Sequence, residues 1–174
     1  FPATLSVINL YKQKVDDTAN FPRVIRKDYF TIYPDQKIPI PDNVDIDKIN
    51  EIPIPKFDAI ISNFPFIQQE DIPKEELKEY FKTEFGEDQK AFLEGSQFDI
   101  NGKSDYYIYC FYNSLKFLKD NGVLPAITSN AWLGKNYGVQ FKQFLLDNFH
   151  IKYVVRSNAE HWFKDSKVST IFLT

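Results

Sequence analysis

The sequence contains few of the residues on which redox and metal chemistry depend. Its 174 residues include no methionine, one cysteine and two histidines. A single cysteine cannot form a disulfide within the chain, and Cys110 stands in an apolar helical pattern, so we expect a buried thiol in a protein from a reducing compartment. His150 and His161 have no further Cys or His close in sequence, which argues against a metal site.

Long hydrophobic runs are absent as well. No segment approaches the roughly 20 apolar residues that a membrane-spanning helix needs, and no signal peptide is visible, so we expect no association with a membrane. Methionine is missing even at position 1. We therefore expect the chain to be a piece of a longer protein.

Aromatic side chains, in contrast, are abundant. Seventeen Phe, ten Tyr and two Trp bring the aromatic fraction to 17%, and 43% of the residues are hydrophobic, which is typical of a folded domain. The formal net charge of −3 does not indicate a DNA-binding domain. Residues 103–174, however, carry nine Lys and Arg against five Asp and Glu. This excess fits either an ordinary solvated surface or a face toward a phosphate backbone.

Hydrophobic periodicity predicts helices and strands in alternation. Predicted helices cover Pro2–Lys12, Asp71–Phe85, Asp105–Lys119 and Tyr137–Asn148. Predicted strands lie near Val24–Ile25 and at Phe57–Ser62, Val123–Thr128, Ile151–Val155 and Val168–Leu173. The order indicates an α/β fold with a mostly parallel sheet. Because no helix separates the last two strands, the final strand is expected to be antiparallel.

Two segments are expected to be irregular. The proline-rich stretch from Tyr33 to Lys56 favours an extended, polyproline-like connection. Gly86–Lys103 is polar and contains glycine, as in a surface loop. Tyr106 and Tyr107, which open the next predicted helix, are expected to be packing residues.

The most informative segment is Phe57–Phe66, in which an apolar strand, expected to be buried and parallel, ends in a polar, aromatic corner. In open α/β sheets, ligands bind at the carboxyl ends of the parallel strands. Here Asn63 supplies an amide oxygen that can accept hydrogen bonds from an amino group, Pro65 restricts the backbone, and Phe66 presents a flat ring. The alternative is an ordinary Asn-containing turn with buried aromatic residues.

The corner Asn63-Phe64-Pro65-Phe66 resembles the Asp/Asn/Ser-Pro-Pro-Tyr/Phe signature of amino-group methyltransferases. Further segments extend the resemblance over nearly the whole chain, in the order found in the N6-adenine DNA methyltransferases of restriction–modification systems: Asp28–Phe30, Ser104–Tyr107, Leu115–Leu124, Ile127–Leu133 and Trp162–Thr170. The chain is thus similar to class I S-adenosylmethionine-dependent methyltransferases. The fold that this implies is a Rossmann-like methyltransferase sheet flanked by helices and truncated on its N-terminal side.

The resemblance also implies catalytic roles for the corner. Asn63 and the main-chain carbonyl of Phe64 would hold the amino group of adenine, and Pro65 would fix the backbone. Phe66 and Phe163 would stack on a base that has been rotated out of double-stranded DNA. From the residues alone, Phe163 could also be an ordinary core residue.

For the cofactor, the resemblance implies that Asp28 and Tyr29 contact the adenine of S-adenosylmethionine, although Asp28 could also be a helix cap or a turn residue. The glycine-rich loop for the methionine end of the cofactor and the acidic residue for its ribose are not in the chain. We therefore interpret residues 1–174 as a partial catalytic domain, with the cofactor-loop strand upstream and a target-recognition region downstream. We expect the isolated piece to be inactive and to bind the cofactor weakly or not at all.

One residue of the corner departs from the signature. Phe64 stands where the family has a proline, so the carbonyl oxygen is kept but the fixed φ of proline is lost. Either Pro65 alone holds the corner, or activity is impaired.

The sequence leaves three functions open. The leading interpretation is a fragment of a site-specific DNA methyltransferase that methylates adenine N6. It would act in a restriction–modification or phage-defence system, in the cytoplasm of a bacterium or archaeon, with restriction or specificity subunits or domains as partners. A second interpretation keeps the cofactor but methylates glutamine N5 or an RNA amino group. The third is a degenerate methyltransferase fold that binds nucleic acid or pairs with an active subunit, an interpretation that Phe64 favours.

Overall fold

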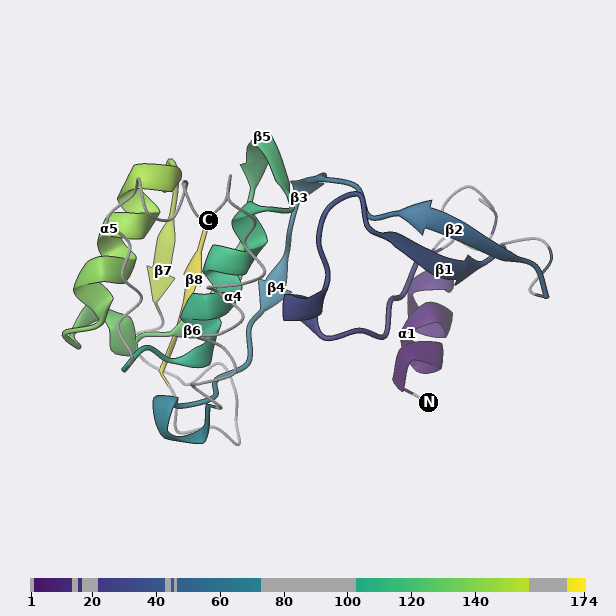
Figure 1. Cartoon of the computed structure of the whole chain (residues 1–174). Coiled ribbons are helices and arrows are strands. Elements are labelled where there is room, and N and C mark those ends of the chain that lie inside the picture. The colour runs from purple at the N-terminus through teal and green to yellow at the C-terminus, as the bar shows by residue number, and fades with distance from the viewer. Residues whose placement is uncertain are drawn as a thin grey trace. The chain divides into compact units, whose positions relative to one another are not determined.

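The computed structural model describes residues 2–13, 16, 22–42, 45, 47–72, 103–156 and 169–174 (Figure 1). The chain divides into two compact units, Phe1–Lys56 and Phe57–Thr174. Most of the helix predicted at Asp71–Phe85, nearly all of the loop predicted at Gly86–Lys103, and Phe163 lie outside the described residues.

The described residues of the first unit form a helix, a short 3₁₀-helix and a β-hairpin. Its elements are α1 (Pro2–Tyr11), η2 (Tyr29–Thr31), β1 (Lys37–Pro41) and β2 (Ile49–Pro53). The predicted first helix is confirmed to within one residue. The strand predicted near Val24–Ile25 is wrong, because residues 22–28 pair with no strand in the described part of the chain. A short extended segment needs a neighbour to supply the hydrogen bonds of a strand.

The hairpin corrects the prediction of a polyproline-like connection, since β1 and β2 pair antiparallel. The Asp42 N–H donates to the Lys48 carbonyl at 2.8 Å. Hydrogen-bonded and non-hydrogen-bonded pairs alternate along such a ladder. Counted from that bond, Pro39, Pro41 and Pro53 all fall in pairs that require no N–H donor. The prolines therefore leave the ladder intact, as proline can in the edge strands of a two-stranded ribbon.

In its described residues, the second unit contains a four-stranded sheet, a separate pair of strands, and two α-helices. The sheet has the order β4 (Ser62–Asn63), β6 (Ala126–Ser129), β8 (Thr170–Leu173) and β7 (Val154–Arg156). The other elements are the parallel pair β3 (Phe57–Ala59) and β5 (Leu118–Val123), the helices α4 (Tyr106–Leu115) and α5 (Gly138–Asn148), and the 3₁₀-helices η3 (Gln69–Asp71) and η4 (Ala131–Leu133).

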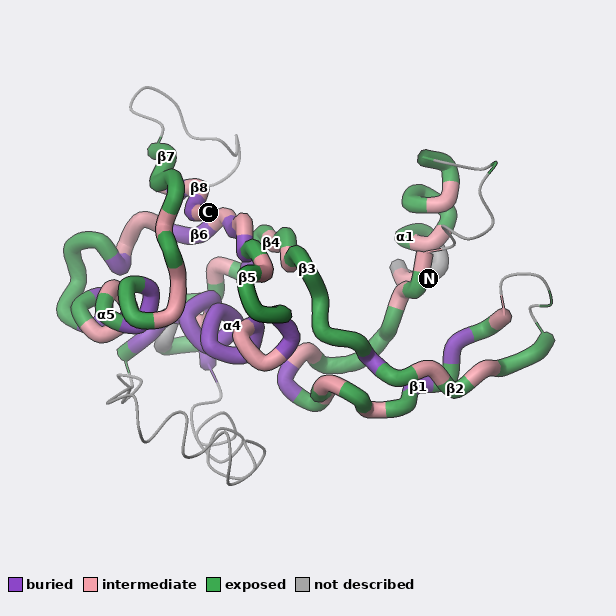
Figure 2. Tube along the Cα trace, turned by 90° about the horizontal axis from the view of Figure 1, so that it is seen from above, coloured by how far each residue is buried: buried purple, intermediate pink, exposed green. Residues whose placement is uncertain are grey.

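In the four-stranded sheet, β8 runs against its neighbours. β4 pairs parallel with β6, whereas β8 is antiparallel to both β6 and β7. It follows that β4, β6 and β7 share one direction, and the prediction of an antiparallel last strand is confirmed. Two of the three pairings are antiparallel, however, so the sheet is mixed and not mostly parallel as expected. In Figure 2, seen from above, α4 and α5 lie on the same side of the four strands.

The strand predicted at Phe57–Ser62 forms in two pieces, β3 and β4, and is not buried as expected. The strand β5, which pairs with β3, has a bulge between Leu118 and Val123, and Asn121 within it has a φ of 63°. In the described part of the chain, β3 and β4 each have one neighbouring strand. Ile61, which lies between the two pieces, is 81% exposed.

The helix predicted at Asp105–Lys119 ends early, at Leu115. The Phe117 N–H closes a turn on the Ser114 carbonyl at 3.1 Å, and the Phe117 carbonyl accepts a hydrogen bond from the Phe57 N–H at 2.7 Å. This second bond directs the chain into β5, so the residues that follow belong to a strand. The helix predicted at Tyr137–Asn148 is confirmed to within one residue as α5.

The core of the second unit is largely aromatic. The ring of Phe141, which is 1% exposed, contacts Phe111 and Trp132 edge to face, each with centroids 5.2 Å apart, and it also contacts Tyr107 and Phe144. Each such pair adds about 0.5–1.5 kcal/mol beyond the burial of area. These contacts join α4, α5 and η4 into one packed body. Cys110 is a buried thiol, as predicted.

Two glycines near the start of α5 provide a test of this packing. A Cβ at Gly138 would overlap the carbonyl oxygen of Trp132, whereas a Cβ at Gly134 would meet nothing within 4 Å. In an unobstructed helix, alanine is preferred over glycine by about 1 kcal/mol. We expect Gly138→Ala instead to lower the free energy of unfolding by about 1–3 kcal/mol, because the backbone must shift.

Urea denaturation of the two variants measures this difference. Gly134→Ala is the matched control and should be close to neutral. Equal stabilities of the two variants would show that η4 and α5 are not in close contact.

Candidate active site

The corner Asn63–Phe66 lies at the carboxyl ends of the parallel strands. β4 ends at Asn63, which is in register with Ile127 of β6. Just beyond the end of β6, the Asn130 N–H donates to the Ser169 carbonyl at 2.8 Å, which holds the start of β8 at the same edge. This is the edge at which open α/β sheets bind their ligands.

The four residues of the corner differ in exposure. Asn63 and Pro65 are exposed, Phe66 is half-buried, and Phe64 is 5% exposed. The Asn63 side chain therefore does not point into a closed interior, and a substrate can reach its amide from solvent. The arrangement meets the first requirement for a group that holds an amino substrate.

Phe64 is anchored by its ring. The ring centroid lies 5.1 Å from that of Phe111 on α4, and Phe111 in turn contacts Phe141. A proline at position 64 would fix φ but would leave this space unfilled. In this chain, the packing of the Phe64 side chain restrains the corner. In the methyltransferase signature that the corner resembles, the ring of a proline does so.

The far end of the corner is held by a helix. The Tyr106 N–H, at the start of α4, donates to the Ile67 carbonyl at 3.1 Å. The segment is thus fixed by strand pairing at Asn63, by packing at Phe64 and by a hydrogen bond at Ile67. Three restraints over five residues give the main chain of the corner, including the Phe64 carbonyl, a defined position.

Next to the corner, three buried polar side chains are joined by hydrogen bonds. The Tyr137 hydroxyl donates to Asp105 Oδ2 at 2.6 Å, and the hydroxyl oxygens of Tyr107 and Tyr137 are 3.2 Å apart. Burial raises the pKa of both hydroxyls well above the usual value. The hydrogen bond to Tyr137 raises the pKa of Tyr107 further, and the bond to Asp105 does the same for the pKa of Tyr137.

Sequence reasoning missed this cluster. It interpreted Tyr107 as a packing residue and did not single out Tyr137. The two tyrosines are separated by 30 residues, a spacing that belongs to no local motif, so their contact depends on how α4 and α5 pack. The available signal was the segment Ser104–Tyr107, which matched the family pattern without an assigned role.

Asp28 and Tyr29 lie in the first unit. Asp28 is exposed and caps η2, since its Oδ1 accepts a hydrogen bond from the Phe30 N–H at 2.8 Å. The capping role that the sequence left open is therefore present. Because a carboxylate has further acceptor sites, the predicted contact with a cofactor stays a prediction. The half-buried Tyr29 ring lies 5.9 Å from the ring of Phe30.

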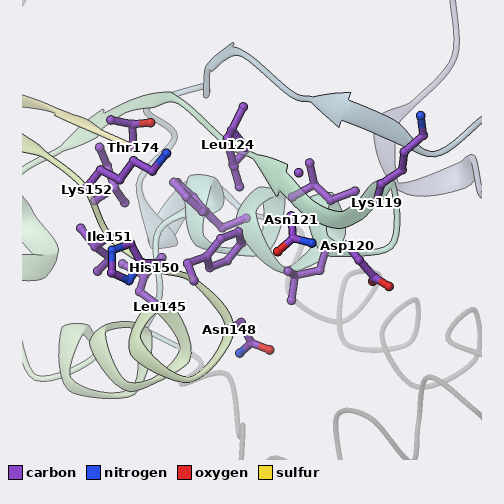
Figure 3. Close-up of a pocket in the computed structure, with 17 residues that line it drawn as sticks. Lys119, Asp120, Asn121, Leu124, Leu145, Asn148, His150, Ile151, Lys152 and Thr174 are labelled. Atoms are coloured by element: carbon purple, nitrogen blue, oxygen red, sulfur yellow. The ribbon is translucent and has the colours of Figure 1, made fainter.

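A pocket of about 550 Å³ lies at the opposite edge of the sheet (Figure 3). Its lining includes Leu124 just before β6, His150 and Lys152 before β7, and Thr174 after β8. These positions mark the amino ends of the strands that run parallel, whereas the corner lies at their carboxyl ends. The pocket is therefore separate from the candidate active site.

Two further findings concern the described residues only. They contain no group of three or more His, Cys, Asp or Glu side chains placed to hold a metal ion. None of the described helices is long and apolar enough to cross a membrane.

Comparison with known proteins identifies the family. Residues 9–163 match the model of the Eco57I restriction-modification methylase family. The chain belongs to this family. The type II methyltransferase M.BstVI of Geobacillus stearothermophilus is 29% identical over 100 residues, which make up 58% of this chain and 16% of the relative. The predicted resemblance to restriction–modification methyltransferases is thus confirmed at the level of the family. Since the matched segment is a small part of the relative, the activity of the whole protein is a matter of inference.

The packing of Phe64 generates a prediction about stability. Phe64→Ala removes a buried ring from its contact with Phe111, so we expect the free energy of unfolding to fall by about 3–5 kcal/mol. Phe57→Ala, at a ring that is 39% exposed, is the control and should cost much less. Chemical denaturation of both variants provides the measurement, and equal losses would mean that the Phe64 ring does not anchor the corner.

The buried tyrosines generate a prediction about alkaline pH. Burial raises the pKa of Tyr107, Tyr112 and Tyr137, so the folded state holds their protons more tightly than the unfolded state, whose tyrosine pKa is about 10. The stability linked to these groups is complete below about pH 10 and is lost as the pH rises further. In an absorbance titration, fewer than the ten tyrosines should ionise before the chain unfolds. Reversible ionisation of all ten in the folded protein would contradict the burial.

Proposed function

We propose that this chain is part of a DNA methyltransferase that transfers a methyl group from S-adenosylmethionine to N6 of adenine in double-stranded DNA. The supporting observation is that Asn63 lies at the carboxyl end of a parallel strand, in a chain that belongs to a restriction-modification methylase family. The side chain is exposed at the carboxyl end of β4, and the neighbouring carbonyl belongs to the anchored residue Phe64.

The corner supplies what adenine N6 requires. The lone pair of this amino group is delocalised into the ring, so the nitrogen is a weak nucleophile. Asn63 Oδ1 and the Phe64 carbonyl oxygen accept hydrogen bonds from the two N–H groups of the amine. This favours a more tetrahedral nitrogen and directs its lone pair toward the methyl group of the cofactor. As the N–C bond forms, the S–C bond breaks with its electron pair left on sulfur, and N6 loses one proton to solvent.

The base must leave the duplex to reach the corner. Extrusion costs a few kcal/mol, and stacking on an aromatic ring returns about 1–3 kcal/mol of it. Phe66 follows the corner directly and is half-buried, so part of its ring is available to a base. Phe163 is proposed as a second ring.

S-adenosylmethionine supplies an electrophilic methyl group when it is bound. The first unit offers an acceptor for the amino group of its adenine, because Asp28 is exposed and keeps an acceptor oxygen beyond the one that caps η2. Tyr29 next to it offers part of a ring face. We assign these two residues to the adenine of the cofactor.

The degenerate interpretation loses its main support. It was based on the replacement of the signature proline by Phe64, taken as a loss of function. The Phe64 ring, however, fills a space in the core against Phe111. A residue that packs in this way is suited to its place, and the carbonyl that the chemistry uses is unchanged.

The experiment measures transfer of labelled methyl groups by the full-length protein. Removal of one preorganised hydrogen-bonding group from an active site costs about 10²–10³-fold in rate, so we expect a loss of this size in Asn63→Ala. Asn148→Ala is the matched control. Asn148 lies at the end of α5, where its Nδ2 donates to the Phe144 carbonyl at 2.9 Å, and it lines the pocket at the opposite edge. This variant should keep nearly full activity.

The nature of the product tests the acceptor. Digestion of the labelled DNA to nucleosides should yield labelled N6-methyldeoxyadenosine. Label in RNA or protein with unmodified DNA would favour the second interpretation. Full activity of Asn63→Ala would disprove the proposed role of the corner.

A further inference from the structure

A chain of buried hydrogen bonds lies next to the corner Asn63–Phe66. Tyr137 gives its one hydroxyl proton to Asp105 Oδ2, so Tyr107 must be the donor in its bond to the Tyr137 oxygen. The main chain of Trp132 also acts on the Tyr107 hydroxyl, lowering its pKa against the larger effect of burial. Two hydrogen bonds thus join three buried side chains of this cluster.

Asp105 is used differently from most acidic residues at the start of a helix. It is the N-cap of α4, where an aspartate usually accepts a hydrogen bond from a main-chain N–H of the first turn. The Asp105 side chain forms no such bond and is 6% exposed. Its oxygen instead binds Tyr137, the N-cap residue of α5. The carboxylate therefore joins the starts of two helices.

The same cluster reaches the other segments at this edge. Tyr106, the neighbour of Asp105, holds the Ile67 carbonyl at the end of the corner. Trp132 belongs to η4, and its Nε1 donates to Thr128 Oγ1 of β6 at 3.2 Å. Hydrogen bonds therefore link the end of the corner to α4 and the start of α4 to the start of α5. Ring contacts of Trp132 and Tyr107 with Phe141 connect η4, and through it β6, to the same cluster.

We propose that Asp105, Tyr107 and Tyr137 are positioning residues for methyl transfer. They fix the start of α4, which holds the corner at Ile67, so that Asn63 Oδ1 and the Phe64 carbonyl meet the amino group in the productive geometry. This inference rests on the proposed function of the corner. A displacement of a reacting group by about 1 Å can cost about 10²-fold in rate, so small shifts of α4 are sufficient for a large effect.

The alternative role of such a cluster is stability alone. A purely structural cluster would lower the melting temperature when a hydroxyl is removed, but it would leave kcat of the folded enzyme unchanged. A positioning cluster lowers kcat at temperatures at which every variant is folded, and it leaves the KM values for DNA and for S-adenosylmethionine nearly unchanged.

The test compares Tyr137→Phe, Tyr107→Phe and Asp105→Asn in the full-length protein. Tyr112→Phe is the matched control, because Tyr112 is also buried on α4 but its ring stacks on Phe144 at 3.8 Å. Two quantities are measured for each protein. One is the steady-state rate of DNA methylation, and the other is hydrogen exchange of the Tyr106 N–H, which reports the bond to Ile67.

We expect Tyr137→Phe to lower kcat by at least about 10-fold and to speed the exchange of the Tyr106 N–H. Tyr112→Phe should do neither, even if it costs as much stability. Tyr137→Phe combined with Asp105→Asn should lose little more than the worse single variant, because both act on the same hydrogen bond: the first removes its donor and the second replaces its charged acceptor by a neutral one.

An unchanged kcat in Tyr137→Phe overturns the inference, whether or not the exchange of the Tyr106 N–H becomes faster. A wild-type protein that methylates no DNA overturns the proposed function itself. The two failures are distinct, because the first requires an active wild-type enzyme and the second is seen before any substitution is made.

Discussion

The ring of Phe141 provides the contact on which the second unit depends. It touches Tyr107 and Phe111 of α4, Trp132 of η4 and Phe144 of its own helix, so one side chain fixes two helices and the segment that follows β6. Through Phe111 the same cluster holds the ring of Phe64. Because protein interiors are close-packed, a shift of any one of these rings is passed on to the others. The position of the corner is therefore a consequence of core packing.

Exposure and burial alternate at the corner for a simple geometric reason. Successive side chains of an extended segment point to opposite sides, so the burial of Phe64 turns Asn63 and Pro65 outward. The same packing that stabilises the second unit makes the polar group accessible. A proline at position 64 would restrain the backbone by its own covalent ring, whereas a phenylalanine needs a partner in the core. Phe111 on α4 is the core residue that packs against Phe64, the residue that departs from the signature.

Much of the fold follows from the order of apolar and polar residues. The helical periodicity of Gly138–Asn148 and the apolar stretch that contains β6 depend on local spacing, so both were predicted. The predictions that failed concern segments whose structure depends on a partner. The prolines of β1 and β2 suggested a polyproline-like connection, yet their positions in the ladder allow a hairpin. The end of α4 is set by a hydrogen bond between Phe57 and Phe117, which are sixty residues apart.

By itself, the sequence determined the residue types at Asn63–Phe66, on which the proposed chemistry rests, and much of the order of strands and helices around them, because both depend on residue types and on short spacings. Tertiary structure alone decided which residues surround the corner. Asp105, Tyr107 and Tyr137 meet only once α4 and α5 have packed. The exposure of Asn63 was likewise decided by the burial of its neighbour against a helix more than forty residues further along the chain. Contacts between residues so far apart depend on the folded core, and no local pattern encodes them.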